Sequence, residues 1–260
     1  MPRFAANLTM LFNEVDFLDR FGEAARAGFR GVEYLFPYSH PREAIAERLA
    51  RHGLEQVLHN LPAGDWAKGE RGIACHPERK GEFREGVGLA VEYARALRCP
   101  RLNCLAGIAP AGAEPGQLRE TLVANLRYAA AELARAGIDL LVEPINTRDI
   151  PGFYLCHTAQ AIALLEEVGA PNLKLQYDAY HMQVMEGDLA RTLEANLSRI
   201  GHVQIADNPG RHEPGTGEIN YPFLFGHLDR IGYRGWVGCE YKPAAATGAG
   251  LAWFGPWRAM

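Results

Sequence analysis

The sequence has few cysteines, and none of them forms a C-x-x-C pair. There are five, an odd number that argues against a disulfide framework or a structural zinc site and is typical of reduced thiols. No apolar run reaches the roughly 18 residues of a membrane-spanning helix. The first residues also lack the pattern of a signal peptide, so we expect a cytoplasmic protein without a membrane partner.

Clustered positive charge is also scarce. The formal net charge is −4, and the short basic groups are interrupted by acidic residues. A protein that binds a phosphodiester backbone normally carries a basic patch, so nucleic acid is not an expected partner. Hydrophobic residues make up 48% and charged residues 22% of the chain, which is enough apolar material for an ordinary globular core.

One order of elements recurs along the chain: a helical pattern, a glycine and then an apolar strand. Gly28, Gly137 and Gly232 each follow a predicted helix, where glycine is the usual left-handed cap. Apolar strands between amphipathic helices are typical of parallel strands buried on both faces. The predicted strands are Phe4–Met10, Gly31–Phe36, Leu54–Asn60, Arg101–Gly107, Asp139–Ile145, Leu173–Asp178, His202–Ala206 and Trp236–Tyr241.

These strands alternate with predicted helices such as Glu82–Leu97 and Leu118–Ala136. Eight β/α units in about 250 residues predict an α/β fold, a single (β/α)8 TIM barrel over residues 1–260. The main alternative is an open doubly wound sheet, but no G-x-G-x-x-G motif follows the first strand. Two long connections, Leu61–Glu82 and Ala206–Tyr221, fall at the carboxyl end of the barrel. They are either functional lids or plain surface loops.

Each of the last four predicted strands has, toward its carboxyl end, a polar residue that could bind a hard cation: Glu143, Asp178, Gln204 and Glu240. Inward-pointing residues at the carboxyl ends of barrel strands converge on the axis. Three carboxylates near one point repel one another unless a cation neutralises them. Oxygen ligands favour Mg²⁺ or Mn²⁺ over zinc. Any one of these residues alone is equally well explained as an ion-pair partner or a helix cap.

Six segments of the chain resemble the hydroxypyruvate isomerase family, which belongs to the xylose-isomerase-like barrel superfamily. They are FAANLTMLFNEV (4–15), LVEPIN (141–146), LQYDAYH (175–181), HVQIAD (202–207), RHEPGTGEINYP (211–222) and GCEYKP (238–243). The resemblance extends over essentially the whole chain. The first segment and the 211–222 loop are its more specific parts, because the strand-end glutamates are shared across the superfamily.

The resemblance implies that the four residues named above hold a divalent metal, and that Glu143 and Glu240 transfer the proton. The implied reaction interconverts hydroxypyruvate and 2-hydroxy-3-oxopropanoate (tartronate semialdehyde) through an enediolate. A cation on the carbonyl and hydroxyl oxygens would stabilise the developing charge. Many epimerases of the superfamily have histidine where this chain has Gln204, and this difference favours Mg²⁺ or Mn²⁺ over softer metals.

Five further residues are candidates for binding a small anionic sugar acid. Related epimerases use a histidine at the spacing of His181 from Asp178, although a buried histidine bonded to backbone would look the same. Arg211 and Lys242 are candidates for the substrate carboxylate, or else solvated surface charges. His59 and Asn60 end the third strand and are expected to line the pocket, with a packing role as the alternative for His59.

Three other functions compete with this interpretation. A larger sugar acid such as 2-oxotetronate, or a ketose 3-epimerase reaction, would use the same metal and glutamates. A DNA-repair enzyme on the same barrel would need more histidine ligands and a basic patch. A barrel that only binds a sugar acid would not need the glutamate pair.

The sequence leaves a homo-oligomer open, and the aromatic segment Leu251–Trp257 is expected to cover the barrel of its own chain.

Overall fold

The computed structural model describes residues 2–258 and forms a closed barrel of eight parallel strands in the order of the chain. This confirms the predicted TIM barrel. β1 closes the ring against β8, with Ala5 opposite Gly238. The strands are β1 (Arg3–Asn7), β2 (Gly31–Glu33), β3 (Glu55–Asn60), β4 (Arg101–Cys104), β5 (Asp139–Val142), β6 (Leu173–Asp178), β7 (Ile200–Ile205) and β8 (Trp236–Cys239).

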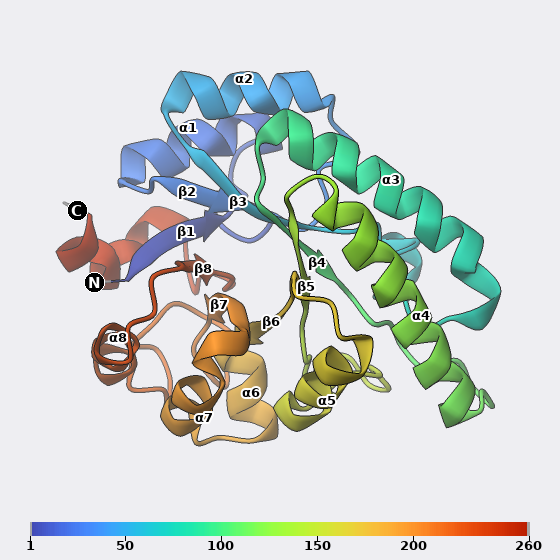
Figure 1. The fold of residues 1–260 in the computed structure, drawn as a ribbon. Coiled ribbons are helices and arrows are strands. Elements are labelled where there is room, and N and C mark those ends of the chain that lie inside the picture. The colour runs from blue at the N-terminus through green and yellow to red at the C-terminus, as the bar shows by residue number, and fades with distance from the viewer. Residues whose placement is uncertain (1, 259–260) are drawn as a thin grey trace.

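Helices surround the barrel (Figure 1), with α1 to α4 along the upper and right sides of the view and α5 to α8 along the lower side. Their bounds are α1 (Phe17–Ala27), α2 (Arg42–His52), α3 (Lys80–Leu97), α4 (Pro115–Ala134), α5 (Thr158–Val168), α6 (Ala179–Met185), α7 (Leu189–Asn196) and α8 (Tyr221–Arg230). The two helices predicted with bounds therefore form, and each begins a little earlier than expected. No helix among residues 2–258 is both long and apolar enough to cross a membrane.

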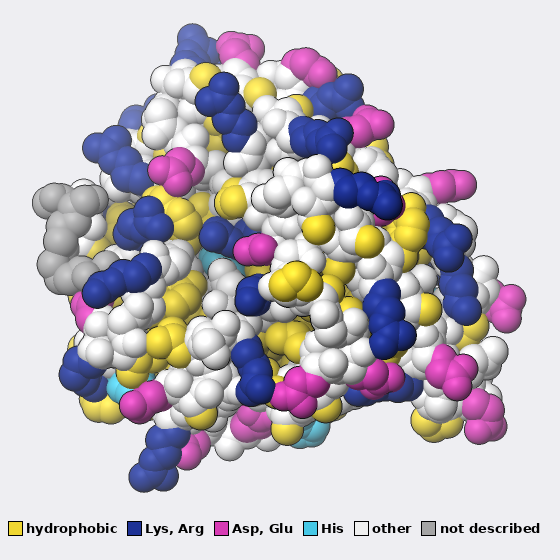
Figure 2. Space-filling view, in the orientation of Figure 1, with side chains coloured by type: hydrophobic (Ala, Val, Ile, Leu, Met, Phe, Trp, Pro, Cys, Tyr) yellow, Lys and Arg dark blue, Asp and Glu magenta, His cyan; other side chains and the backbone are white. Residues whose placement is uncertain are grey.

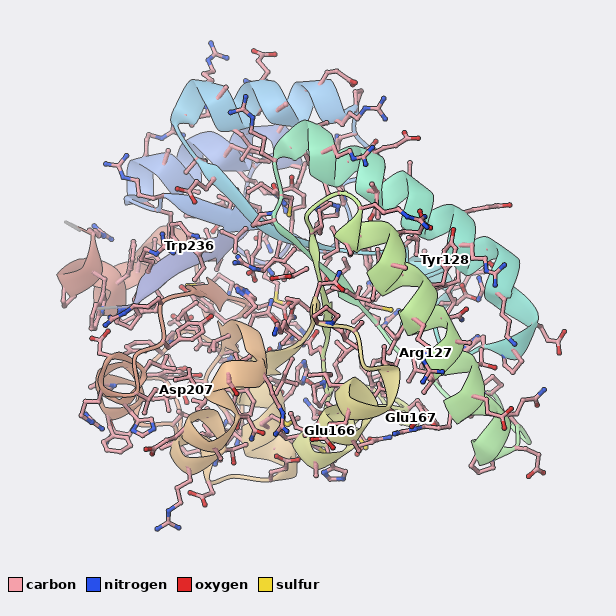
Figure 3. The ribbon with its side chains drawn as sticks, viewed as in Figure 1. Arg127, Tyr128, Glu166, Glu167, Asp207 and Trp236 are labelled. Atoms are coloured by element: carbon pink, nitrogen blue, oxygen red, sulfur yellow. The ribbon has the colours of Figure 1, made fainter. Side chains whose placement is uncertain are left out.

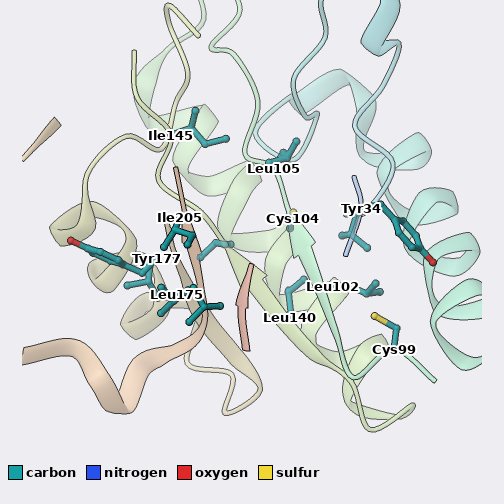
Figure 4. Close-up of a cluster of buried hydrophobic side chains, with 14 of the residues drawn as sticks. Tyr34, Cys99, Leu102, Cys104, Leu105, Leu140, Ile145, Leu175, Tyr177 and Ile205 are labelled. Carbon is teal, nitrogen blue, oxygen red and sulfur yellow. The ribbon is translucent and has the colours of Figure 1, made fainter. Parts of the chain in front are cut away.

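The main core lies between the strands and the helices, because the strands are apolar on both faces. Figure 4 shows part of this layer, including Leu102, Leu140 and Leu175 from neighbouring strands. Each of the three is fully buried. The chain reverses between helix and strand at glycine: Gly28 ends α1 at φ 100°, a left-handed conformation that disfavours other residues.

Six strands end earlier than predicted, at Asn7, Glu33, Cys104, Val142, Ile205 and Cys239. The residues beyond these ends leave the hydrogen-bonded ladder and turn into loops. Several of them, including Met10, Leu35 and Ile145, instead line a cavity at the carboxyl end of the barrel. Strand propensity alone cannot predict where the chain leaves the sheet, because the residues beyond the strand ends are still apolar.

Both long connections are ordered by specific contacts. The loop after β3 contains the 3₁₀ turns η1 (Trp66–Lys68) and η2 (Pro77–Arg79). In the loop after β7, the Asp207 carboxylate (Figure 3) accepts hydrogen bonds from four backbone amides, the last at Ile219.

The C-terminal η4 (Thr247–Trp257) packs on the barrel of its own chain, as expected, with the Trp253 ring 5.2 Å from that of Phe4.

Candidate active site

A cavity of about 560 Å³ opens at the carboxyl ends of the strands. Six of the predicted site residues line it: Asn60, Glu143, His181, Arg211, Glu240 and Lys242. A hollow of about 650 Å³ lies at the opposite end of the barrel, beside Trp236 (Figure 3), and none of the predicted residues lines it. Because TIM-barrel enzymes place their chemistry at the carboxyl ends, we assign the candidate site to the first cavity.

Three carboxylates and one histidine meet at the inner end of this cavity. Glu143, Asp178, His181 and Glu240 each place one potential ligand atom within 4.8 Å of the others. All four side chains are buried. The convergence expected from the strand ends is therefore present for all three predicted carboxylates.

Two of the carboxylates each direct one oxygen to a local partner and leave the other without one. Glu143 Oε2 accepts from Asn103 Nδ2 at 2.9 Å. Asp178 Oδ1 caps α6 by accepting from the amides of Tyr180 and His181. The remaining oxygens, Glu143 Oε1 and Asp178 Oδ2, are buried and have no hydrogen-bond partner among the described residues. Such unsatisfied acceptors are costly without a ligand.

Glu240 is held from two sides. Its Oε2 accepts from Arg211 Nη2 at 2.7 Å and its Oε1 from Asn7 Nδ2 at 3.3 Å. Burial raises the pKa of Glu240 to about 8, although Arg211 opposes the shift. Burial, together with the neighbouring Glu240 and Asp178, raises the pKa of Glu143 well above its usual range. Without a cation, these groups resist ionisation near neutral pH.

The residues present fit a divalent cation. Two unpartnered buried oxygens and a third carboxylate lie close enough to share one ion, and their mutual repulsion is the property that a bound cation relieves. The donor set is rich in oxygen, which suits a hard metal. A buried cluster that could hold a metal is therefore present.

His181 is better placed as a hydrogen-bond donor than as a ligand. Its Nδ1 lies 2.7 Å from Asn146 Nδ2, and Asp149 fixes the Asn146 amide by contacting both its oxygen and its nitrogen. Asn146 therefore donates to Nδ1, so the ring proton is on Nε2. Burial, followed by the positive charge of Arg211, lowers the pKa of His181 well below its usual range. A neutral ring thus presents Nε2–H toward Asp178, 3.9 Å away.

Gln204 lies beside the cluster, directly opposite Asp178 on the neighbouring strand. Its Nε2 donates to Glu33 Oε1 at 2.7 Å, and its Oε1 accepts from Gln176 Nε2 at 2.6 Å. The Glu33 bond fixes which end of the amide carries the oxygen. Because a carbonyl oxygen has a second lone pair, this arrangement is compatible with metal binding, and the ligand role of Gln204 stays a prediction.

The other predicted binding residues differ in position. Arg211 reaches into the cavity, but it is paired with Glu240 and lies 3.9 Å from Asp149. Lys242 and Asn60 line the cavity wall. His59 does not, because its ring lies on the other side of β3 and stacks near Tyr34. Burial lowers the pKa of His59 to about 3. We therefore assign His59 to the core beside the barrel.

Several polar residues of the site were not expected from the sequence. Asn7, Glu33 and Asn103 support the cluster from β1, β2 and β4, while Asp149 and Arg71 reach the cavity from loops. Strands β1, β2 and β4 each have a polar residue toward the carboxyl end, which is the pattern from which the site residues of β5 to β8 were predicted. Arg71 lies in the long 61–82 loop, which the sequence placed at the carboxyl end of the barrel without indicating which of its residues would reach the cavity. Asp149 carried no signal, since its place depends on the path of its loop.

Comparison with known proteins agrees with this geometry. Residues 21–257 match the model of the family described as xylose isomerase-like TIM barrel. The chain is 58% identical to a hydroxypyruvate isomerase of Escherichia coli over 99% of this chain and 100% of that one. It is 51% identical to a 2-oxo-tetronate isomerase of Cupriavidus necator, with 99% of each chain covered. A solved structure titled AP endonuclease, family 2, from Brucella melitensis has a TM-score of 0.97 and 53% identity, covering 99% of this chain and 100% of that one.

The fold and the site thus define a TIM barrel whose strand ends carry a buried acidic cluster that could hold a cation. The chain belongs to the xylose isomerase-like TIM barrel family. The relationship to hydroxypyruvate isomerase that its sequence segments indicated is confirmed.

Proposed function

We propose that this chain is an isomerase that interconverts hydroxypyruvate and 2-hydroxy-3-oxopropanoate with a divalent cation. The observation that carries the proposal is the cluster of Glu143, Asp178 and Glu240, in which two glutamates flank a buried carboxylate with an unpartnered oxygen. Binding alone would not need a pair of buried glutamates able to transfer a proton. Two relatives that share 58% and 51% of its residues are named hydroxypyruvate isomerase and 2-oxo-tetronate isomerase.

The cation would be held by Glu143, Asp178 and Glu240, with Gln204 as a fourth ligand. When bound, Mg²⁺ or Mn²⁺ supplies positive charge at the carbonyl and hydroxyl oxygens of the substrate. Everything else in the reaction is assigned to groups of this chain.

One of the two glutamates removes a proton from C3 of hydroxypyruvate, and the resulting enediolate takes a proton at C2 from the other. The proton of the original hydroxyl moves to the oxygen on C2, so the product is an aldehyde with a new hydroxyl group. His181 Nε2–H donates to a substrate oxygen and stabilises its developing charge. Asn103 orients Glu143, and Arg211 orients Glu240. Leu105 and Ile145 form apolar parts of the cavity wall beside these groups.

The size of the cavity supports a second substrate, 2-oxotetronate, with the same chemistry. About 560 Å³ falls within the range of pockets for ligands considerably larger than a three-carbon acid. The relatives named 2-oxo-tetronate isomerase include one at 51% identity. A four-carbon acid would present the same reacting carbons to the glutamates and place one more carbon in the outer part of the cavity.

The test is turnover of both acids by purified protein after dialysis against EDTA, before and after addition of Mg²⁺ or Mn²⁺. We expect activity to disappear without metal and to return with it, and the ratio of kcat/KM for the two acids identifies the preferred substrate. Full activity in a preparation shown to be free of metal would contradict the cation-dependent reaction. Turnover of a panel of neutral ketoses, measured on the same samples, distinguishes the 3-epimerase alternative from a sugar-acid isomerase.

The structure adds little support for a nucleic-acid enzyme. On the face shown in Figure 2, basic and acidic side chains are interspersed and form no continuous basic patch. The net charge of −4 agrees with this distribution. We therefore expect no salt-resistant binding to duplex DNA in the same preparation.

A further inference from the structure

Three basic side chains line the cavity: Arg71, Arg211 and Lys242. Arg211 is already neutralised, since it pairs with Glu240 and lies near Asp149. Within residues 2–258, neither Arg71 nor Lys242 forms an ion pair. The wall of the cavity therefore carries positive charge that the protein itself does not balance, while its inner end carries three carboxylates.

The guanidinium of Arg71 is held in place without using the edge that binds anions best. Its Nη1 donates to the carbonyl oxygens of Glu70 at 2.7 Å and Trp66 at 3.1 Å. The group also lies over the Trp66 ring, 4.1 Å from its centre. No partner for Nε or Nη2 is found in the described part of the chain. These two N–H groups point the same way and form the fork that binds a carboxylate with two hydrogen bonds.

The backbone that carries Arg71 is also fixed. Gly72 has φ 111°, and it bridges to Ala106 just after β4. A Cβ atom at this position would lie 2.4 Å from the carbonyl oxygen of Leu105, so only glycine fits there. Arg71 is thus tied to the end of β4, although it belongs to a long loop.

We propose that Arg71 binds the carboxylate of the substrate through Nε and Nη2, with Lys242 adding positive charge nearby. This inference rests on the proposed function, because it assigns one end of a sugar acid to Arg71 and the reacting end to the acidic cluster. A carboxylate is repelled by Glu143, Asp178 and Glu240 and attracted by an unbalanced guanidinium. The arrangement selects sugar acids over neutral ketoses that offer the same reacting carbons.

The test compares Arg71→Met with the wild-type protein on two substrates that share the reacting carbons, hydroxypyruvate and uncharged dihydroxyacetone. Loss of a charge-assisted, two-bond contact should lower kcat/KM for hydroxypyruvate about 10- to 100-fold, mainly through KM. The much slower reaction of dihydroxyacetone should change far less. Arg71→Lys should recover part of the loss because it restores charge without the fork.

Arg84→Met is a matched control. Arg84 is an exposed arginine that also lies over an aromatic ring, that of Tyr128, and it is not part of the cavity wall. The Arg84→Met variant loses the same charge and the same type of stacking as Arg71→Met. Because Arg84 lies outside the cavity, the kinetics of this variant should equal those of the wild type. Equal losses on both substrates in Arg71→Met, or no loss on either, would overturn the assignment of Arg71.

A binding measurement keeps this inference separate from the isomerase proposal. Calorimetric titration of metal-loaded protein with D-glycerate, which cannot isomerise, should give a Kd about 10-fold or more weaker in Arg71→Met than in Arg84→Met. Binding of D-glycerate can be measured even if the wild-type protein turns over neither acid. Absence of turnover would refute the proposed function but not the role of Arg71. An unchanged Kd would refute the role of Arg71 and leave the isomerase proposal standing.

Discussion

The barrel buries carboxylates in two different ways, and the contrast separates a carboxylate whose hydrogen bonds are all made within the protein from two that keep an oxygen free for a cation. Glu33, from β2, has both oxygens satisfied: Oε1 accepts from Asn7 and Gln204, and Oε2 contacts His202 Nε2 at 2.7 Å. In the half formed by β5 to β8, Glu143 and Asp178 each keep a buried oxygen with no hydrogen-bond partner in the described chain. Burial alone therefore does not identify a functional acid.

The two halves divide the work of the site accordingly. Strands β1, β2 and β4 supply Asn7, Glu33 and Asn103, which contact the reacting groups or Gln204 and fix their orientation. The other half supplies the groups that we propose to hold the cation and to move the proton. Substitutions in the second half should abolish most of the turnover. Substitutions in the first half should only change the orientation of the reacting groups, so their effect should be smaller.

The largest effect should follow from Glu143→Gln and Glu240→Gln. An amide keeps an oxygen for the cation but cannot accept the proton, so we expect each variant to lose about 10²- to 10⁴-fold in turnover while metal binding stays measurable. The two losses should not add in the double variant, because either one already interrupts the same transfer. Steady-state kinetics together with metal titration of each variant provide the measurement.

Exchange of the carbon-bound hydrogen of the substrate with solvent deuterium refines this experiment. If one glutamate begins the reaction, the variant that lacks the other should still exchange hydrogen without forming product. Near-normal turnover in either single variant, with metal bound, would remove that residue from the proton-transferring pair.

A change of intermediate size should appear in the stability of the metal-free protein as a function of pH. In the folded protein, the pKa of Glu240 is raised to about 8 from its usual value of 4.5, and the pKa of Glu143 is raised as well. Between these values the folded protein binds more protons than the unfolded chain, so the free energy of unfolding is greatest at low pH and falls as pH rises. We expect a decrease on the order of a few kcal/mol.

Thermal unfolding at about pH 5.5 and about pH 8.5, with EDTA and with Mg²⁺, measures this window. The metal should remove most of the decrease, because it replaces the protons on the carboxylates. The Glu143→Gln/Glu240→Gln double variant serves as the control and should show a flatter dependence. Stability of the metal-free protein that rises with pH would show that the carboxylates are not the groups in question.

The sequence was sufficient for the carboxylates because barrel geometry makes the position of a residue on its strand equivalent to its position in space. Glu143, Asp178 and Glu240 each stand at a strand end, so their convergence needs no knowledge of the loops. Strand geometry also limits the prediction for His59 and Asn60: adjacent residues point to opposite faces, so only one of them faces the interior, and that one is Asn60.

Other parts of the site depend on contacts that no local pattern encodes. Arg71 reaches the cavity because Gly72 ties its loop to β4, some thirty residues later in the chain. His181 presents Nε2–H because Asn146, from another loop, occupies Nδ1. Arg211 lies where the sequence placed it, but its partner is a protein carboxylate. Each of these facts depends on the folded path of a loop, which hydrophobic periodicity does not specify.

The smallest of the three effects tests whether the first half acts through orientation. A Cβ atom at Gly238 would lie 2.3 Å from Glu33 Oε2, so Gly238→Ala must displace the Glu33 carboxylate. Gln204 and Asn7 would then lose their shared partner, and Asn7 also contacts Glu240. Displacing a group that orients metal ligands typically weakens metal binding by about 10- to 100-fold. We expect a loss near the lower end, with the fold retained, measured by metal titration and circular dichroism.

Gly201→Ala is the matched control, because it adds the same methyl group to the neighbouring strand β7. Its Cβ would lie 2.6 Å from Leu141 Cδ2 and 2.9 Å from the Lys174 side chain, and neither of these residues belongs to the site. Overpacking of this kind costs about 1–3 kcal/mol of stability, so both variants should unfold at a lower temperature. Only Gly238→Ala should also bind metal more weakly. If the two variants lost stability and metal affinity alike, Glu33 would be a packing residue, and the distinction between orienting and reacting halves of the barrel would fail.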